Sequence, residues 1–257
     1  MNVLLDISIG EKYSNPSQKV RVITENWVAK NAFCPRCGND KLKQCENNKP
    51  VSDFICTNCG NVFECKAKKG SLGIKITDGA YDSMIKRIND ENNADFFFMS
   101  YSYNDFCVDD FIFVPKYFFT ERIIEKRKPL SPNARRAGWV GCNILLGEIP
   151  EEGRIKIIKN RIIQNKDSIC DKVNKTKFIS NISLFSRGWL LDVMNCVNKI
   201  NRQEFELMDI YNFENQLKIL HPQNNNIQAK IRQQLQLLRD KGLVEFLGNG
   251  KYKKVEV

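Results

Sequence analysis

Apolar positions in the first two thirds of the chain switch between helical spacing and short strand-like runs. Apolar residues recur at roughly helical spacing over 16–30 and predict a helix there. A second helix is predicted at 80–89, and strands are predicted at 51–55, 62–66, 95–101, 110–115 and 154–158. Helices beside a small mixed sheet predict an α/β or α+β core.

The pattern changes after the polar segment 165–177, which we interpret as the approach to a domain boundary. Beyond it, helices are predicted at 189–200, 207–220 and 227–239, followed by strands at 243–247 and 251–255 around an Asn-Gly turn. Three helices closed by a basic hairpin predict a winged helix, whose third helix usually enters the DNA major groove. We therefore expect a first domain at 1–182 and a winged-helix DNA-binding domain at 183–257.

Composition favours a globular protein with a polyanionic partner. A hydrophobic content of 42% is enough for packed cores, and no apolar run approaches the roughly 18 residues of a membrane span. No signal-peptide pattern opens the chain, so we expect a cytoplasmic protein without a membrane partner. We also expect a monomer. Lys and Arg number 40 against 30 Asp and Glu, which favours nucleic acid as the partner, although a merely basic protein has the same charge.

The ten cysteines include two Cys-x-x-Cys pairs, Cys34 with Cys37 and Cys56 with Cys59, separated by eighteen residues. This spacing is typical of zinc sites, and four thiolates close a tetrahedral shell without an open position. We therefore predict a structural Zn²⁺ site; the alternative is four free or buried thiols. We interpret five of the others as bystanders: Cys45, Cys107, Cys142, Cys170 and Cys196.

The single histidine, His221, limits the possible chemistry. A nuclease site built on several histidines is excluded, and any Ser-His-Asp or Cys-His site would depend on His221 alone. Because it precedes Pro222 in an apparent loop, we expect an ordinary surface histidine.

A second kind of site is predicted beside the cysteines. Side chains alternate along a strand, so Glu64 and Lys66 point to one face, and Asp53 on a paired neighbouring strand can reach the same face. Two carboxylates suit Mg²⁺, which polarises a phosphodiester and activates water. Lys66 can orient that water or stabilise the charge that develops on the phosphate.

The three residues follow the Pro-Asp…Glu-x-Lys pattern of the PD-(D/E)xK nuclease superfamily, with Pro50 two positions further upstream than in the tight form. Taken alone, the pattern also fits a solvated strand face with an ordinary ion pair. The hairpin, the preceding helix, the basic charge and the predicted winged helix favour the nuclease.

Candidate DNA contacts fall in two regions. Within the basic, turn-rich segment 122–143, Arg135 and Arg136 suit phosphates or guanine edges, and Trp139 either stacks on DNA or caps the core. In the winged helix, the candidates are Asn226, Gln228, Arg232, Gln233, Lys251 and Lys253.

Six blocks of the sequence, in unchanged order from about Ser17 to Tyr252, resemble the DpnI family of type IIM methyl-directed restriction endonucleases. They are 47–54, 66–70, 78–81, 134–139, 186–189 and 230–235. The resemblance implies a nuclease domain followed by a winged helix, both reading methylated DNA, and cleavage of GATC only when its adenine carries an N6-methyl group.

The resemblance also assigns residues. Asp53, Glu64 and Lys66 match the family's catalytic positions, and the two cysteine pairs match its zinc ligands. The expected partner is thus adenine-methylated double-stranded DNA, and the expected cofactors are catalytic Mg²⁺ and structural Zn²⁺. Two alternatives stay open from the residues alone: a zinc-containing winged-helix regulator without chemistry, and a PD-(D/E)xK repair or junction nuclease.

Overall fold

The computed structural model describes residues 1–45, 52–90 and 93–255. This part of the chain divides into two compact units, which are described separately. The first comprises 1–148 with 153–174, and the second 149–152 with 175–257. Within the described ranges, no helix is both long and apolar enough to cross a membrane.

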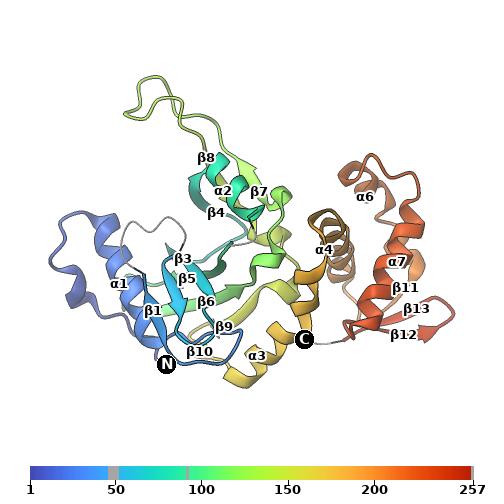
Figure 1. Cartoon of the computed structure of the whole chain (residues 1–257), viewed down its shortest axis with the longest axis horizontal. Coiled ribbons are helices and arrows are strands. Elements are labelled where there is room, and N and C mark those ends of the chain that lie inside the picture. Colours follow the sequence, from blue (N-terminus) through green and yellow to red (C-terminus); the bar gives the residue numbers. More distant parts are fainter. Residues whose placement is uncertain (46–51, 91–92, 256–257) are drawn as a thin grey trace. The chain divides into compact units, whose positions relative to one another are not determined.

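A seven-stranded mixed sheet is the frame of the first unit (Figure 1). In spatial order its strands are β1 (Leu42–Gln44), β2 (Phe54–Cys56), β3 (Val62–Lys69), β5 (Asp95–Tyr101), β6 (Val108–Val114), β9 (Ile155–Lys159) and β10 (Ile162–Ile163). Only the β3–β5 pair of this sheet runs parallel; the other described pairs are antiparallel. All seven residues of β5 are buried, as expected for a central strand covered on both faces.

Helix α1 (Pro16–Asn31) packs against one face of this sheet. Its start is well defined, because the Asn15 side chain accepts hydrogen bonds from the backbone N–H groups of Ser17 and Gln18, and Pro16 occupies the first turn. Trp27 meets the Phe111 ring edge-on, with 5.2 Å between ring centroids. This contact belongs to the main apolar core.

The crossover between β3 and β5 builds a second layer. Parallel neighbours cannot be joined by a tight turn, so the chain travels through β4 (Ile76–Ala80) and α2 (Tyr81–Ile88) before it enters β5. Strand β4 pairs with β8 (Gly141–Ile144), which in turn pairs with β7 (Ile124–Lys126). The loop 127–140 between β7 and β8, called the arm below, projects away from this small sheet (Figure 1).

The remaining elements of the chain are short or peripheral. Helix α3 (Lys166–Thr176) covers the polar segment that we interpreted as the approach to a domain boundary. The 3-10 helices are η1 (Ile7–Gly10), η2 (Lys116–Phe118), η3 (Glu121–Ile123), η4 (Leu146–Glu148), η5 (Glu151–Gly153) and η6 (Lys177–Asn181).

A buried carboxylate ties the first unit together. Asp95, the fully buried first residue of β5, accepts two hydrogen bonds from the Arg36 guanidinium at 2.5 and 2.7 Å. It also accepts from the Asn61 side chain at 2.6 Å and from the backbone N–H of Lys116 at 2.7 Å. Arg36 lies between Cys34 and Cys37, and Asn61 follows Cys59. Asp95 therefore anchors both cysteine-containing loops to β5.

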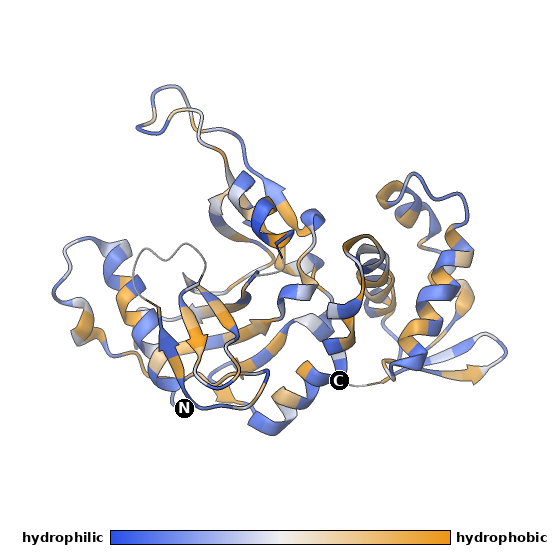
Figure 2. Cartoon of the chain, viewed as in Figure 1, coloured by the Kyte–Doolittle hydropathy of each residue, from blue (hydrophilic) through white to orange (hydrophobic). Residues whose placement is uncertain are grey.

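The second unit is a winged helix. It contains α4 (Leu184–Lys199), β11 (Glu204–Glu206), α5 (Leu207–Tyr211), α6 (Glu214–Leu220), α7 (Ile227–Asp240), β12 (Val244–Gly248) and β13 (Lys251–Lys254). Helix α7 buries Ile227, Ile231, Leu235 and Leu238 on one side, and its mixed colours in Figure 2 show this amphipathic pattern. The wing turns at Asn249 and Gly250, whose φ angles of 49° and 73° suit an Asn-Gly hairpin turn.

Two expectations for the second unit are wrong. The single helix predicted at 207–220 is two helices, because α5 ends at Tyr211 and α6 begins at Glu214. His221 is not an ordinary surface residue: its ring stacks on Trp189 with centroids 3.7 Å apart, and its Nε2 lies 2.8 Å from an Asp192 carboxylate oxygen. The contact with Asp192 joins residues 29 positions apart, so local sequence could not reveal it.

Replacing Arg36 with Ala should destabilise the first unit strongly. The substitution leaves the Asp95 carboxylate buried without its cationic partner, which costs about 3–5 kcal/mol. Urea unfolding measures the change. The matched control is Arg161→Ala, whose ion pairs with Asp105 and Asp109 are solvent-exposed, and it should change the free energy of unfolding far less. Equal losses for the two variants would contradict the anchoring role of Asp95.

Candidate active site

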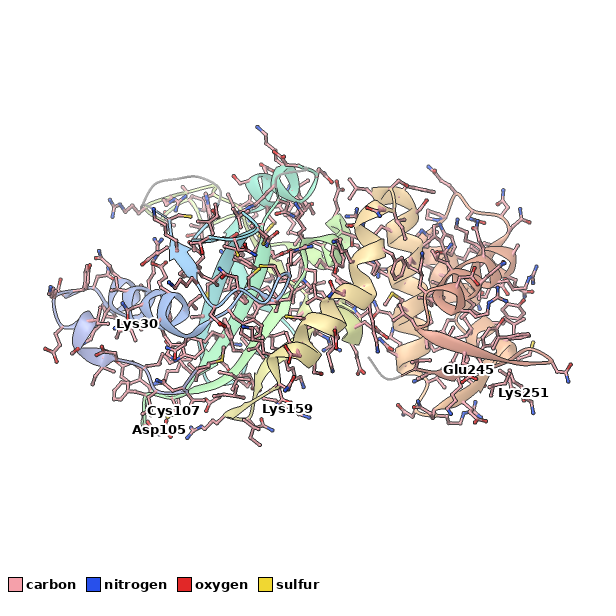
Figure 3. The ribbon with its side chains drawn as sticks, turned by 60° about the horizontal axis from the view of Figure 1, so that its bottom comes forward. Lys30, Asp105, Cys107, Lys159, Glu245 and Lys251 are labelled. Carbon is pink, nitrogen blue, oxygen red and sulfur yellow. The ribbon has the colours of Figure 1, made fainter. Side chains whose placement is uncertain are left out.

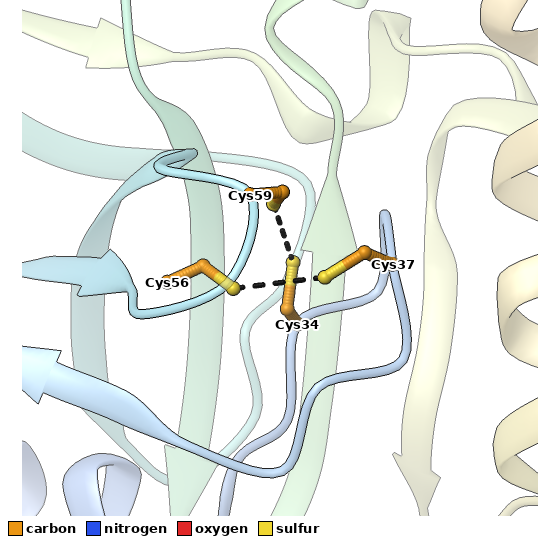
Figure 4. Close-up of side chains that lie close together, drawn as sticks. All are labelled: Cys34, Cys37, Cys56 and Cys59. Carbon is orange, nitrogen blue, oxygen red and sulfur yellow. Dashed lines mark hydrogen bonds between the residues drawn. The ribbon is translucent and has the colours of Figure 1, made fainter.

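The four predicted zinc cysteines meet in space. Cys34 and Cys37 come from the loop after α1, Cys56 is the last residue of β2, and Cys59 lies in the turn between β2 and β3 (Figure 4). The Sγ atoms of Cys34 and Cys59 lie 3.6 Å apart, as do those of Cys37 and Cys56, and all four lie within 4.8 Å of one another. Within the described ranges, this is the only group of three or more His, Cys, Asp or Glu side chains close enough to share an ion.

The cluster is compatible with zinc. A tetrahedral zinc with Zn–S bonds of about 2.3 Å places its sulfurs about 3.8 Å apart, close to the separations found here. Burial raises the pKa values of the Cys34 and Cys59 thiols. At Cys56 burial acts in the same direction, but hydrogen bonds from the backbone N–H groups of Cys59 and Asn58 and from the side chains of Cys37 and Cys59 outweigh it and lower the pKa to about 6. Thiolate is the form that binds metal, so Cys56 is the cysteine of this group that its surroundings favour most as a ligand.

The second cysteine pair lies at the tip of the hairpin that carries the predicted catalytic residues. Cys56 and Asn61 close the turn through a backbone hydrogen bond of 2.8 Å. The strand predicted at 51–55 is displaced, because β2 begins at Phe54, while Val51 lies outside the described residues. Asp53 therefore stands just before β2, one position beyond the registered pair Phe54 and Phe63.

Asp53 lies at the end of the β2–β3 ladder, directly before the first residue of β2. Its backbone N–H donates to the Phe63 carbonyl at 2.9 Å, and its carboxylate accepts from the backbone N–H of Cys65 at 2.8 Å. Burial raises the pKa of this carboxyl, the Cys65 hydrogen bond lowers it, and the nearby Glu25 raises it again, with a net upward shift. The side chain is thus held in a partly desolvated position beside β3.

Glu64 and Lys66 lie on one face of β3, as strand alternation predicts, and both take part in a charged network. The Lys66 ammonium lies 2.6 Å from a Glu64 carboxylate oxygen and 2.5 Å from Asp78, and Arg87 pairs with the other Glu64 oxygen. Burial lowers the pKa of Lys66, but Glu64 and Asp78 outweigh it and raise that pKa, so the ammonium stays charged at neutral pH.

Sequence reasoning missed Asp78 and Arg87. Asp78 lies on β4 and Arg87 on α2, so both come from the crossover that the parallel β3–β5 pair requires. The 78–81 block contains Asp78, but nothing in its spacing from Glu64 indicates a contact. Only the path of the crossover brings these residues to the site.

The arm exposes Arg135 and Arg136, whereas Trp139 is half-buried. Arg136 lies over the Trp139 ring, 4.7 Å from its centroid. The ring packs against Gly141, where an added Cβ would lie 2.9 Å from two ring carbons. Trp139 is therefore neither a freely exposed wedge nor a buried core residue.

The winged-helix candidates are exposed on α7 and on the wing. Asn226 is the N-cap residue of α7, and Gln228, Arg232 and Gln233 lie in its N-terminal half, the part that usually contacts base edges. Arg232 donates to the Tyr211 hydroxyl at 2.6 Å, and Gln228 to Glu214 at 2.8 Å. Figure 3 marks Lys251 on the wing hairpin, and the side chains of Lys251 and Lys253 are exposed there.

A mixed α/β core with a zinc-compatible cysteine cluster, followed by a helix-turn-helix domain of the winged type, is the architecture of a DNA-acting enzyme. Residues 1–182 match the Dam-replacing family, DpnI, and residues 185–254 match the Dam-replacing HTH domain. The chain belongs to this family, which is a family of restriction endonucleases.

Replacing Cys59 with Ser should remove the metal and loosen the hairpin. Purified wild-type protein should carry about one zinc per chain, and Cys59→Ser should lose most of it, with a melting temperature lower by about 10 °C or more. Elemental analysis and a thermal melt measure both. Cys45→Ser is the matched control outside the cluster and should retain the metal. Wild-type protein with far less than one zinc per chain would refute the site.

Proposed function

We propose that this protein is a methyl-directed restriction endonuclease that hydrolyses double-stranded DNA at GATC sites carrying N6-methyladenine. The observation that carries the proposal is the arrangement of Asp53, Glu64 and Lys66 on the β2–β3 hairpin of a chain that belongs to the Dam-replacing family. Membership of the family supports the restriction activity, and the site supports phosphodiester hydrolysis as its chemistry.

Asp53 and Glu64 are the residues that would hold Mg²⁺, because carboxylate oxygens are the ligands this ion prefers. When bound, the ion polarises the phosphodiester and lowers the pKa of a water. The Lys66 ammonium, charged and held by carboxylates, can orient the attacking water and stabilise negative charge on the phosphate. Arg87 restrains the Glu64 side chain from the opposite side.

The proposed role of zinc is mechanical. Four thiolates leave no open coordination position, so the ion takes no part in the chemistry. It would instead clamp the tip of the hairpin whose two strands lead to Asp53 and Glu64. Removal of zinc should therefore damage activity through structure, whereas removal of magnesium should be reversible.

Methyl recognition is expected to be shared between the two units. An N6-methyl group adds a small apolar surface in the major groove, and its burial stabilises a complex by only about 1 kcal/mol. One such contact gives only a modest preference for methylated over unmethylated DNA. Strict discrimination therefore needs several contacts with the methyl groups. Trp139 in the arm and the exposed polar residues of α7, Asn226, Gln228 and Gln233, are our candidates.

Digestion of matched methylated and unmethylated plasmids, with and without Mg²⁺, tests the function directly. We expect cleavage only of adenine-methylated DNA and only with the ion. Binding without cleavage under every condition would instead indicate a winged-helix regulator. Cleavage irrespective of methylation, with preference for branched or damaged DNA, would indicate a repair nuclease.

Replacing Asp53 with Ala should reduce cleavage by about a hundredfold or more while the protein stays folded, because one of two metal-holding carboxylates is lost. Single-turnover cleavage of a methylated duplex is the measurement. Asp82→Ala, which removes an exposed carboxylate from the start of α2, is the control and should cleave normally. Wild-type cleavage by the Asp53 variant would remove this residue from the mechanism.

Replacing Arg232 with Ala should weaken binding to methylated DNA about tenfold, because an exposed cation at the N-terminal half of α7 is lost. Titration of a labelled duplex without Mg²⁺ is the measurement. Arg239→Ala removes another exposed arginine, from the last turn of the same helix, and should change binding little. Equal effects of both variants would argue against α7 as the reading helix.

A further inference from the structure

Lys66 is held by a carboxylate outside the predicted catalytic set. Asp78 Oδ1 lies 2.5 Å from the Lys66 ammonium, slightly closer than the Glu64 oxygen at 2.6 Å. The Asp78 side chain is only 7% exposed, so the pair is poorly accessible to water. Pairing a buried carboxylate with a partly buried ammonium costs desolvation energy, so stability alone explains the Asp78–Lys66 pair poorly.

A β-bulge in β4 lies next to Asp78, whose side chain contacts Lys66. Asp78 pairs with Cys142 and Ala80 with Gly141, so Gly79 is an extra residue in β4. Bulges of this kind redirect a side chain and recur beside active sites. The backbone N–H of Gly79 also donates to Asp78 Oδ1 at 2.7 Å, which fixes the same oxygen that contacts Lys66.

The two carboxylates on Lys66 differ in what else they must do. In the proposed mechanism Glu64 also binds a metal ion, and in this structure its second oxygen already pairs with Arg87. Asp78 has no such second task, so it can keep its hold on the ammonium throughout the reaction. Without it, Lys66 would depend on a carboxylate whose charge is shared among several cations.

We propose that Asp78 is a positioning residue that holds the Lys66 ammonium in place for cleavage. The proposal rests on the proposed function, because it assigns a partner to a residue of that mechanism. The bulge also adjoins the base of the arm, since the Tyr81 N–H donates to the Val140 carbonyl at 3.1 Å and Ala80 pairs with Gly141. The Asp78–Lys66 contact therefore connects Lys66, through β4, to β8, the strand that follows the arm.

The test compares Asp78→Asn, Asp78→Glu and the surface control Asp82→Asn in the full-length protein. Single-turnover cleavage of a methylated duplex and the dissociation constant for that duplex without Mg²⁺ are measured for each. We expect Asp78→Asn to cleave about tenfold to a hundredfold more slowly while the dissociation constant changes by no more than about twofold. Asp78→Glu should recover part of the rate, and Asp82→Asn should match wild type.

A double variant shows whether Asp78 acts through Lys66. In a Lys66→Ala background, adding Asp78→Asn should change the residual rate little, because the group to be positioned is absent. The proposal would be overturned if Asp78→Asn slowed cleavage as much in the Lys66→Ala background as in the wild type. It would also be overturned if Asp78→Asn alone lowered both the affinity for the duplex and the melting temperature. Normal cleavage by Asp78→Asn would overturn it while the nuclease function stands. Failure of the wild type to cleave would instead refute the proposed function, and the proposal with it.

Discussion

The first unit depends on a single buried carboxylate. Asp95 accepts hydrogen bonds from Arg36 in one cysteine loop, from Asn61 beside the other, and from the backbone at Lys116. It is also the first residue of β5, which pairs in parallel with β3. In this pairing Phe96 of β5 lies opposite Glu64 of β3. One desolvated charge therefore sets the position of both loops against the strand pair that carries the candidate site.

The β2–β3 hairpin, which carries the candidate site, is restrained at two places by different interactions. At its tip, four thiols converge at separations that suit zinc, and they would hold the turn by coordination. Along β3, the crossover places Asp78 against Lys66 and Arg87 against Glu64. Charged groups gathered in this way cost desolvation energy, so stability alone explains their presence poorly.

Much of this molecule could be predicted from local pattern. The strand expected at 95–101 is β5 with the same bounds, because a short apolar run rich in aromatic residues favours a buried strand. The four cysteines meet as their spacing predicted, and Glu64 and Lys66 share a face because strand side chains alternate. In the second unit, the periodicity of α7 and its Asn-Gly wing turn indicated the winged helix.

Sequence by itself thus determined the family and the types of α1, α4, α7 and β5, and it suggested the residues proposed for the chemistry, since these depend on composition, spacing and periodicity. Tertiary structure alone decided which distant groups meet them. The contacts of Asp95 with Arg36, of Asp78 with Lys66, and of His221 with Trp189 join separate elements. Such contacts follow from strand order and the path of a crossover, and no local pattern encodes either.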